Sequence, residues 1–247
     1  MLKPPLVLYV SMRPYTSIFS LASKRFKIFM INFGIFKLGN YIHTVIKCSY
    51  TNPRDYSKFI KFISSHPNIE HIRVLEKRRR SLSFIAVKKS CRFYEKIITK
   101  EFLVLMPYVI VDGYKKFFIV VTEQSMDDVV EKLKEHGEIV HLETLPFDIA
   151  VNKLTSYINA LNLHSVLTDR QLNILDMAYS WGYYEWPRRL SVTKLAKQLS
   201  LSKSAACERL RKAELKVIKY VLKEALPIIR GTRARRTEIP LKLREIA

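Results

Sequence analysis

The apolar residues of this chain change their spacing near Pro146, and this change constrains the fold more than any other feature of the sequence. Before Pro146, short runs rich in β-branched and aromatic residues alternate with stretches in which apolar residues recur every three or four positions, which is the pattern of strands and helices in alternation. After it, the helical spacing continues alone. The sequence therefore predicts an α+β domain followed by an all-helical domain.

Within the first domain, the apolar patterns predict six strands and three helices. Strands are expected at residues 41–50, 69–76, 82–88, 102–111, 115–122 and 138–145, and helices at residues 55–65, 91–100 and 125–136. Asp112-Gly113 is a strong hairpin signal, because the turn needs residues that accept a positive φ. Ser125 is expected to cap its helix and Gly137 to end it. The order resembles a ferredoxin-like βαββαβ domain with extra βαβ elements, over residues 30–147.

The segment before residue 30 is basic and carries no acidic residue. Its apolar run at residues 6–10 is too short for the core of a signal peptide. Residues 26–39 are apolar but contain two lysines, and they fall short of the ~20 residues of a membrane-spanning helix. We interpret residues 1–29 as a basic N-terminal extension, partly ordered, that leads into a first strand. A membrane-surface segment is the alternative, and Met30 is a second candidate start.

Three hydroxyl residues mark helix starts in the second half of the chain. Thr168-Asp169-Arg170-Gln171 matches a capping box, Ser191 precedes a second helix and Ser202 a third. A connector helix is expected before them, in residues 148–166. The predicted inward faces are Leu172, Leu175, Ala178 and Tyr179 in the first helix, Leu195, Ala196 and Leu199 in the second, and Ala206, Leu210, Ala213, Val217 and Val221 in the third.

The string from Leu195 to Ser204, with a small residue in one helix and a cap before the next, has the form of a helix-turn-helix. The third helix would then enter the major groove. Arg211 can read guanine or grip phosphate, and Glu208 can accept from cytosine N4. The candidate DNA-binding residues are Lys203, Ser204, Cys207, Glu208, Arg211 and Lys212 on this helix, Lys194, Lys197 and Gln198 on the helix before it, and Arg188 and Arg189. The alternative is an ordinary solvated helix face with Glu208–Arg211 pairing.

A further string, Gly182-Tyr183-Tyr184-Glu185-Trp186-Pro187-Arg188-Arg189, precedes the second of these helices, and we expect its rings to pack between helices. With the capping box and the residues around Leu195, it resembles the helix-turn-helix of the archaeal bacterio-opsin-activator-type regulators, over residues 167–219. The resemblance implies a sequence-specific transcription factor whose N-terminal domain senses a signal. Ser200 departs from the glycine that many helix-turn-helix turns carry.

The formal net charge of +21 favours a polyanionic partner, but it is unevenly distributed. Residues 1–100 carry +16, residues 101–166 carry −5, residues 167–225 carry +6 and residues 226–247 carry +4. The basic tail at residues 226–247 is either a DNA-contacting arm or solvated chain. No metal-binding spacing, phosphate-binding glycine loop or nucleophile motif is found, so we expect no cofactor, no metal and no enzymatic activity.

The leading hypothesis is a cytoplasmic, dimeric regulator of transcription that binds double-stranded DNA. Residues 30–147 are expected to form its sensor or dimerisation domain, and residues 167–225 its DNA-binding domain. A small-molecule effector and RNA polymerase are further candidate partners, and no membrane contact is expected. The main alternative is a non-specific RNA-binding or architectural protein that uses the basic N-terminal half. An enzyme fused to a DNA-binding module and an initiation-factor-like protein are two others.

Overall fold

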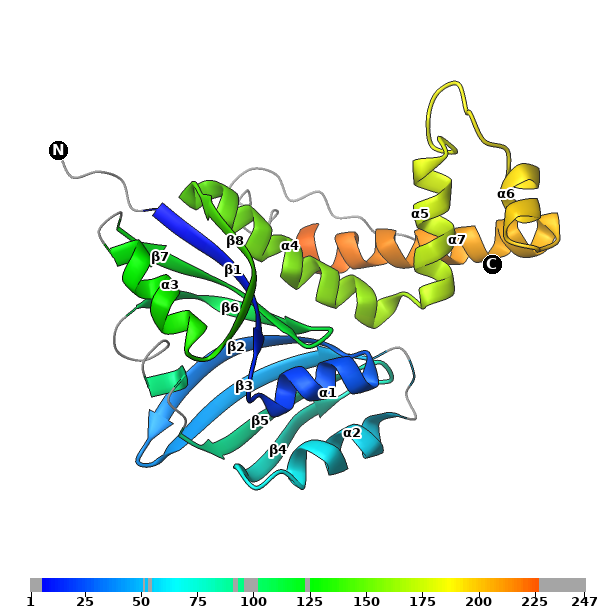
Figure 1. Ribbon diagram of the computed structural model, residues 1–247. Coiled ribbons are helices and arrows are strands. Elements are labelled where there is room, and N and C mark those ends of the chain that lie inside the picture. The colour runs from blue at the N-terminus through cyan, green and yellow to red at the C-terminus, as the bar shows by residue number, and fades with distance from the viewer. Residues whose placement is uncertain are drawn as a thin grey trace, which may run out of the picture. The chain divides into compact units, whose positions relative to one another are not determined.

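The computed structural model describes residues 6–50, 52, 55–90, 93–95, 102–122 and 125–226. The chain divides into two compact units, residues 1–166 and residues 167–247. The first unit is built on a β-sheet and the second is helical (Figure 1). This arrangement confirms the predicted fold class, an α+β domain followed by an all-α domain.

In the described part of the first unit, eight strands form one sheet in which every neighbouring pair is antiparallel. Their order across the sheet is β4-β5-β3-β2-β6-β7-β1-β8. Val111 pairs with Tyr114 across the predicted Asp112-Gly113 turn, in which both residues have a positive φ. The strands are β1 (Leu6–Pro14), β2 (Phe29–Leu38), β3 (Tyr41–Ser49), β4 (Ile69–Lys77), β5 (Ser81–Lys89), β6 (Leu103–Val111), β7 (Tyr114–Val121) and β8 (Gly137–Leu145).

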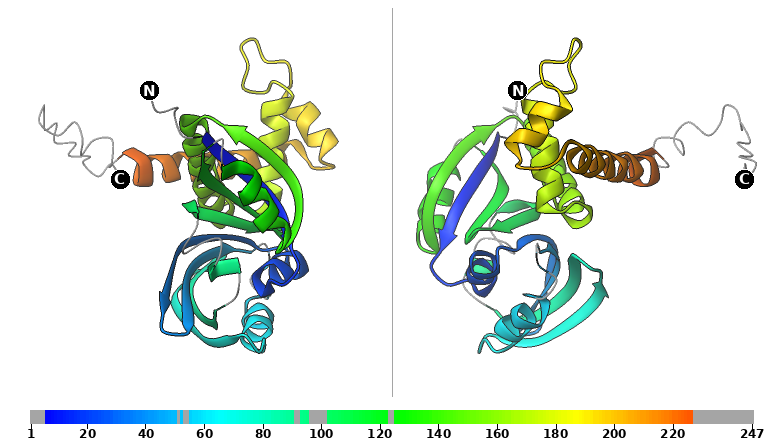
Figure 2. Two further views of the ribbon diagram at one scale, coloured as in Figure 1. Left: turned by 60° about the vertical axis from the view of Figure 1, so that its left-hand side comes forward. Right: turned by 90° about the vertical axis from the view of Figure 1, so that its right-hand side faces the viewer.

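The sheet consists of two similar halves that exchange their first strands. The first βαββαβ series contains β1, α1 (Ile18–Phe26), β2, β3, α2 (Asp55–Ser64) and β4. The second begins at β5 and continues through β6, β7, α3 (Met126–Lys134) and β8. In a ferredoxin-like sheet the first strand lies between the third and fourth strands of its own series. Here β5 lies between β3 and β4, whereas β1 lies between β7 and β8. Figure 2 shows the dark blue β1 beside green strands of the second half.

The prediction of an N-terminal extension at residues 1–29 is wrong for the described part of that segment. β1 pairs on one side with β7 and on the other with β8, and Val7, Val10 and Met12 are fully buried. Because β1 is covered on both faces, it reads as a continuous apolar run rather than an alternation of apolar and polar residues. The short run at residues 6–10 is therefore part of an interior strand of the sheet, and α1 follows it.

Helices cover both faces of the sheet. Side chains of α1, α2 and α3, among them Phe19, Phe59 and Leu133, share one core with inward residues of the strands. On the opposite face lies α4 (Phe147–Val166), whose Leu154 packs with Val7, Tyr9 and Phe118 and whose Leu161 packs with Ile31 and Val109. The expected connector helix is thus a helix of the first unit that covers the centre of the sheet.

The start of α3 is predicted correctly, because Ser125 is its N-cap residue, but the predicted cap bond and the predicted helix end are wrong. The Ser125 hydroxyl makes no cap bond to α3 and instead donates to the Thr122 carbonyl at 3.2 Å. Gly137 does not end α3, because the C-cap is Glu135 and Gly137 opens β8. A Cβ at Gly137 would lie 2.5 Å from the Arg13 carbonyl oxygen, so this glycine permits the close approach of β8 to β1 rather than a helix end.

Two other expectations fall mostly outside the described residues. They are the helix at residues 91–100, of which only residues 93–95 are described, and the basic tail, of which only residue 226 is described. No described helix is both long and apolar enough to cross a membrane.

Candidate nucleic-acid interface

Hydroxyl side chains begin all three helices of the helix-turn-helix, as the sequence predicts. Thr168 and Gln171 form the complete capping box at the start of α5 (Asp169–Ser180). The Ser191 hydroxyl accepts from the Lys194 amide at the start of α6 (Val192–Gln198), and the Ser202 hydroxyl accepts from the Ala205 amide at the start of α7 (Lys203–Tyr220). Each cap satisfies an amide that the helix leaves without a partner, so the caps fix where α5, α6 and α7 begin.

A small apolar core joins these helices. Ala196 of α6 and Ala206 of α7 are buried in it together, which agrees with the expected close approach of the two helices. The core contains Ile174, Ala178, Leu190, Leu195, Ala196, Ala206 and Leu210. The predicted inward face of α5 is partly wrong, because Tyr179 is 76% exposed and Ile174 is buried.

The turn between α6 and α7 is tight and places a non-glycine residue in the left-handed region. Ser200 has a φ of 52°. The amide of the next residue, Leu201, donates to the Ala196 carbonyl at 2.9 Å and closes the turn. Serine therefore occupies the conformation in which glycine is the usual residue, and the departure from the common pattern carries a backbone strain.

All of the candidate DNA-binding residues are exposed. On α7, Lys212 forms an ion pair with Glu208, which replaces the Glu208–Arg211 pairing considered from the sequence. The hydrogen bond from Lys212 lowers the pKa of Glu208, so this carboxylate stays charged. The Ser204 hydroxyl forms a hydrogen bond of 3.1 Å with the Ser202 hydroxyl.

Four cations of this face are available to an anionic partner. They are Lys194 and Lys197 on α6, and Lys203 and Arg211 on α7. None of the four forms an ion pair with the part of the chain that the structure describes. The face thus combines fixed polar groups with available positive charge, which is what contact with phosphates and base edges requires.

The aromatic rings of the loop between α5 and α6 pack only in part as predicted. Tyr183 packs against the helix-turn-helix core, whereas Trp186 is 95% exposed and Tyr184 is 48% exposed. Its two arginines are held within the loop: Arg189 forms an ion pair with Glu185, and the Arg188 guanidinium lies 4.6 Å from the Tyr183 ring centroid. The exposure of Trp186 differs from the expected packing of the rings between helices.

Beyond the core, α7 continues into a short π-helical turn, η3 (Val221–Ala225), and exposes an apolar stripe. Leu215, Ile218, Val221 and Leu222 are each about half exposed, between 45% and 52%. The prediction that Val221 continues the buried stripe is therefore wrong. The i, i+3, i+7 spacing of Leu215, Ile218 and Leu222 was present in the sequence and marks a second apolar face of this helix.

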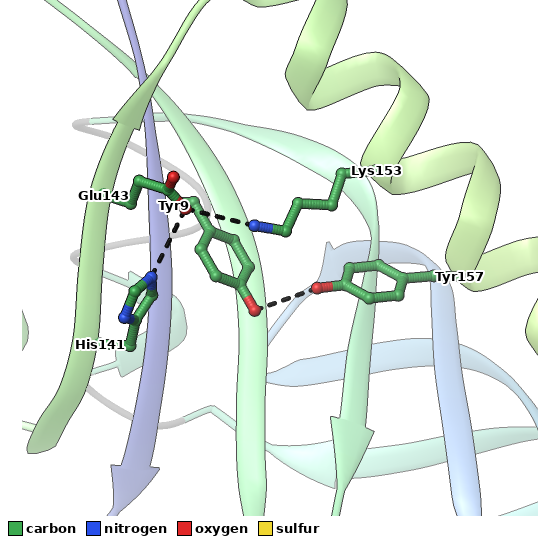
Figure 3. A network of polar contacts seen from close by, with 5 residues as sticks. All are labelled: Tyr9, His141, Glu143, Lys153 and Tyr157. Atoms are coloured by element: carbon green, nitrogen blue, oxygen red, sulfur yellow. Dashed lines mark hydrogen bonds and ion pairs between the residues drawn. The ribbon is translucent and has the colours of Figure 1, made fainter. Parts of the chain in front are cut away.

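In the first unit, a polar network attaches α4 to the sheet (Figure 3). The Tyr157 hydroxyl donates to the Tyr9 hydroxyl at 3.0 Å, and the Lys153 ammonium donates to Glu143 at 3.3 Å. His141 lies on the other side of the same carboxylate, at 3.5 Å. These contacts link the helix to β1 and β8. Among the described residues there is no cluster of His, Cys, Asp and Glu that could hold a metal ion.

Comparison with known families divides the chain in the same way. Residues 167–219 match the family described as an HTH DNA binding domain, and residues 20–139 match a family described as an N-terminal domain. The chain is 36% identical over 109 residues to the dimethyl sulfoxide reductase transcriptional activator of Haloferax volcanii, a match that covers 44% of this chain and 48% of that protein. No solved structure matches the chain.

Two further relatives point in the same direction. The transcriptional regulator NarO of Haloferax volcanii is 30% identical over 108 residues, which cover 42% of this chain and 49% of that protein. The bacterioopsin transcriptional activator of Halobacterium salinarum is 41% identical over 56 residues, which cover 23% of this chain and 8% of that protein. The resemblance of the helix-turn-helix segment to bacterio-opsin-activator-type regulators is thereby confirmed, although the chain spans about half or less of the length of these relatives.

Proposed function

We propose that this protein is a sequence-specific DNA-binding regulator of transcription that reads the major groove with the N-terminal half of α7. The observation that carries the proposal is the capped helix-turn-helix at residues 167–219, which matches a DNA-binding family and exposes a polar, cationic face of α7. Relatives whose names describe transcriptional activators support the same function.

The exposed groups differ in what each can contact. Arg211 carries a planar guanidinium that can bond guanine in two places, and Glu208 can accept from cytosine N4. Lys212 forms an ion pair with Glu208 in the free protein, so it can contact a phosphate only after it leaves Glu208. Lys194, Lys197 and Gln198 of α6 and Lys203 of α7 are suited to the sugar-phosphate backbone. Arg188 and Arg189 reach DNA only if the loop releases them from Tyr183 and Glu185.

We further propose that the protein binds DNA as a homodimer whose two copies meet along the exposed stripe of α7. A single helix-turn-helix reads only a few base pairs, and a second copy supplies the rest of the specificity. Glu208 precedes Ile218 by about ten residues, or ~15 Å at ~1.5 Å per residue. Antiparallel pairing about Ile218 therefore separates the two reading surfaces by up to ~30 Å, comparable with the ~34 Å between half-sites one DNA turn apart.

The first unit is assigned to signal sensing. Support comes from its separation as a compact unit, from its match to a family of N-terminal domains, and from the position of α4. α4 ends at Val166, two residues before the Thr168 cap of α5, so a change in how α4 lies on the sheet is passed directly to the chain that enters the DNA-binding unit.

The decisive experiment is selection of bound sequences from a random DNA pool with the full chain, followed by gel-shift competition. We expect one enriched sequence motif with twofold symmetry, and a protein–DNA complex that a large excess of random DNA does not displace. Recovery of unbiased sequences would contradict specific recognition. Equal binding of single-stranded RNA and duplex DNA would instead favour the alternative of a non-specific nucleic-acid-binding protein.

A further inference from the structure

A pocket of about 440 Å³ lies in the first unit, where four segments meet. They are the end of α1, the start of β2, the β6–β7 turn and the last two turns of α4. Its volume lies in the range of small-molecule sites, ~300–1,000 Å³. Ile28 and Ser23 are buried at its floor, whereas Lys27, Asp112 and Ala160 are exposed at its rim. The pocket is therefore a recess open to solvent rather than a closed packing defect.

Half of the lining is apolar. Ile28, Phe29 and Val111 come from the sheet side, and Ala160 comes from α4. Ala160 adds little bulk to the wall, which leaves room for an aliphatic or aromatic group. Such a surface favours a ligand with an apolar body.

The rim carries one residue of each charge, and each of the two residues lies in a backbone turn of defined conformation. Lys27 and Asp112 both have left-handed backbones, with φ of 50° and 49°, because each lies in a tight turn. Neither forms an ion pair with the described residues. The Asp112 turn is anchored to α1, since the Gly113 amide donates to the Ser23 hydroxyl at 2.9 Å. The two charged residues thus stand on a preformed backbone frame, and the His164 ring adds a polar group from α4.

These charges select among ligand classes. α4 brings its C-terminal end to the pocket, and a helix C-terminus carries partial negative charge, whereas that of α1 is offset by Lys24 and Arg25 in its last turn. Together with Asp112, the end of α4 disfavours a multiply charged anion and favours an ammonium group. Lys27 in turn favours a carboxylate and disfavours a simple cation. An apolar molecule that carries both groups satisfies every part of the lining.

We propose that this pocket binds a small zwitterion with an apolar side chain, the chemistry of a free apolar amino acid. The ammonium group lies beside Asp112, the carboxylate beside Lys27, and the side chain against Ile28, Phe29 and Ala160. Because Ala160 and His164 belong to the last turns of α4, the ligand alters the helix that leads into the DNA-binding unit. This regulatory consequence rests on the proposed function, whereas the binding site does not.

Binding is tested by titration calorimetry on the full chain with free leucine, methionine and phenylalanine, each beside its decarboxylated amine and its N-acetyl form. We expect at least one amino acid to bind, and both of its derivatives to bind at least tenfold more weakly. The assignment is overturned if no amino acid binds at millimolar concentration, or if an amine or N-acetyl form binds as well as its parent.

Two variants test the residues. Asp112→Asn and Lys27→Asn remove one charge each, and asparagine tolerates the left-handed backbone at both positions. Each is expected to raise the Kd at least tenfold, whereas Asp127→Asn on α3, outside the pocket, leaves it unchanged. An unchanged Kd in both pocket variants, with folding verified by circular dichroism, would refute the site.

DNA affinity is then measured with and without the amino acid. A ligand-dependent change of at least threefold, absent in Asp112→Asn, supports the regulatory role. A bound ligand that leaves DNA affinity unchanged refutes that role but retains the site. A chain that binds the amino acid and no DNA refutes the proposed function alone.

Discussion

Ser200 is the residue at which the helix-turn-helix carries strain. Its φ of 52° costs a non-glycine residue ~1–2 kcal/mol relative to an ordinary helical conformation, and glycine avoids most of this cost. Glycine loses more entropy on folding, by ~0.5–1 kcal/mol. We therefore expect Ser200→Gly to stabilise the DNA-binding unit by ~0.5–1 kcal/mol, measured by chemical denaturation. Ser200→Val, which resists a positive φ, is the matched control and should destabilise; equal stability of the two variants would contradict this account.

The two described cysteines differ enough to serve as probes of the interface. Burial raises the pKa of Cys48 to about 12, so its thiol stays protonated and shielded. Cys207 is exposed on the proposed DNA-reading face of α7. We expect an alkylating reagent to label Cys207 and spare Cys48, and the selected DNA site to protect Cys207. Peptide mass spectrometry measures both. Undiminished labelling of Cys207 at saturating DNA would remove it from the interface.

Arg211 and Lys197 test the division between reading bases and holding phosphates. Arg211→Ala is expected to cost ~1–3 kcal/mol on the preferred DNA site and less on random DNA, because a lost base contact affects only the correct sequence. Lys197→Ala is expected to weaken both DNAs about equally. Gel-shift titration of both variants on both DNAs measures the four affinities. If each variant loses the same affinity on specific and random DNA, the assignment of Arg211 as a base-reading residue fails.

At the scale of elements, the attachment of α4 to the sheet depends on pH through Glu143. The hydrogen bond from Lys153, and secondarily that from His141, lowers the pKa of Glu143 in the folded protein. Its stabilising contribution is thus present above the ordinary pKa of a glutamate and disappears as the pH falls through the lowered value. We expect Glu143→Gln to destabilise modestly at neutral pH and not at all once the wild-type carboxylate is protonated.

Tyr157→Phe provides the control for that experiment. Burial, together with the hydrogen bond to Tyr9, raises the pKa of Tyr157, so its hydroxyl remains protonated at neutral pH and in acid. This variant should cost ~0.5–1.5 kcal/mol regardless of acidity. Urea denaturation at neutral pH and at a pH below the lowered pKa of Glu143 measures both variants. A Glu143→Gln effect that does not diminish in acid would show that the ion pair is not its cause.

The elements that the sequence revealed are those whose signals are local. The capping box at Thr168 and the Asp112-Gly113 turn each require only neighbouring residues, and both were predicted correctly. The sequence pattern does not predict β1, because its burial depends on β7 and β8, more than a hundred residues away. The role of Gly137 is not local either, since the backbone it accommodates belongs to β1. The exposure of Trp186 also depends on how helices pack, which a local pattern does not contain.

At the scale of the whole molecule, the net positive charge does not identify a single nucleic-acid-binding surface. Part of the excess in residues 1–100 lies against aromatic rings, with the Lys77 ammonium 3.7 Å from the Tyr56 ring centroid and the Arg25 guanidinium 4.9 Å from that of Phe62. These contacts place basic side chains over apolar surface in the first unit. The exposed cations of α6 and α7 are fewer, but they stand on a helix-turn-helix and remain available for phosphate.

The dimer predicts how DNA binding responds to salt. With about 5–8 phosphate contacts per dimer, log K should fall with log salt at a slope near −5 to −7, and a monomer with half the contacts should show about half that slope. Ile218→Glu places a charge in the middle of the exposed α7 stripe, outside the helix-turn-helix core, and Ile218→Ala is its milder counterpart. We expect Ile218→Glu to give monomers in analytical ultracentrifugation, to halve the slope of log K against log salt, and to abolish the preference for twofold-symmetric sites. The domain should stay folded, because the Thr168 cap and the core around Ala206 are unchanged. A wild-type protein that is already monomeric on DNA, or an Ile218→Glu variant with an unchanged slope, would show that each copy reads its site alone.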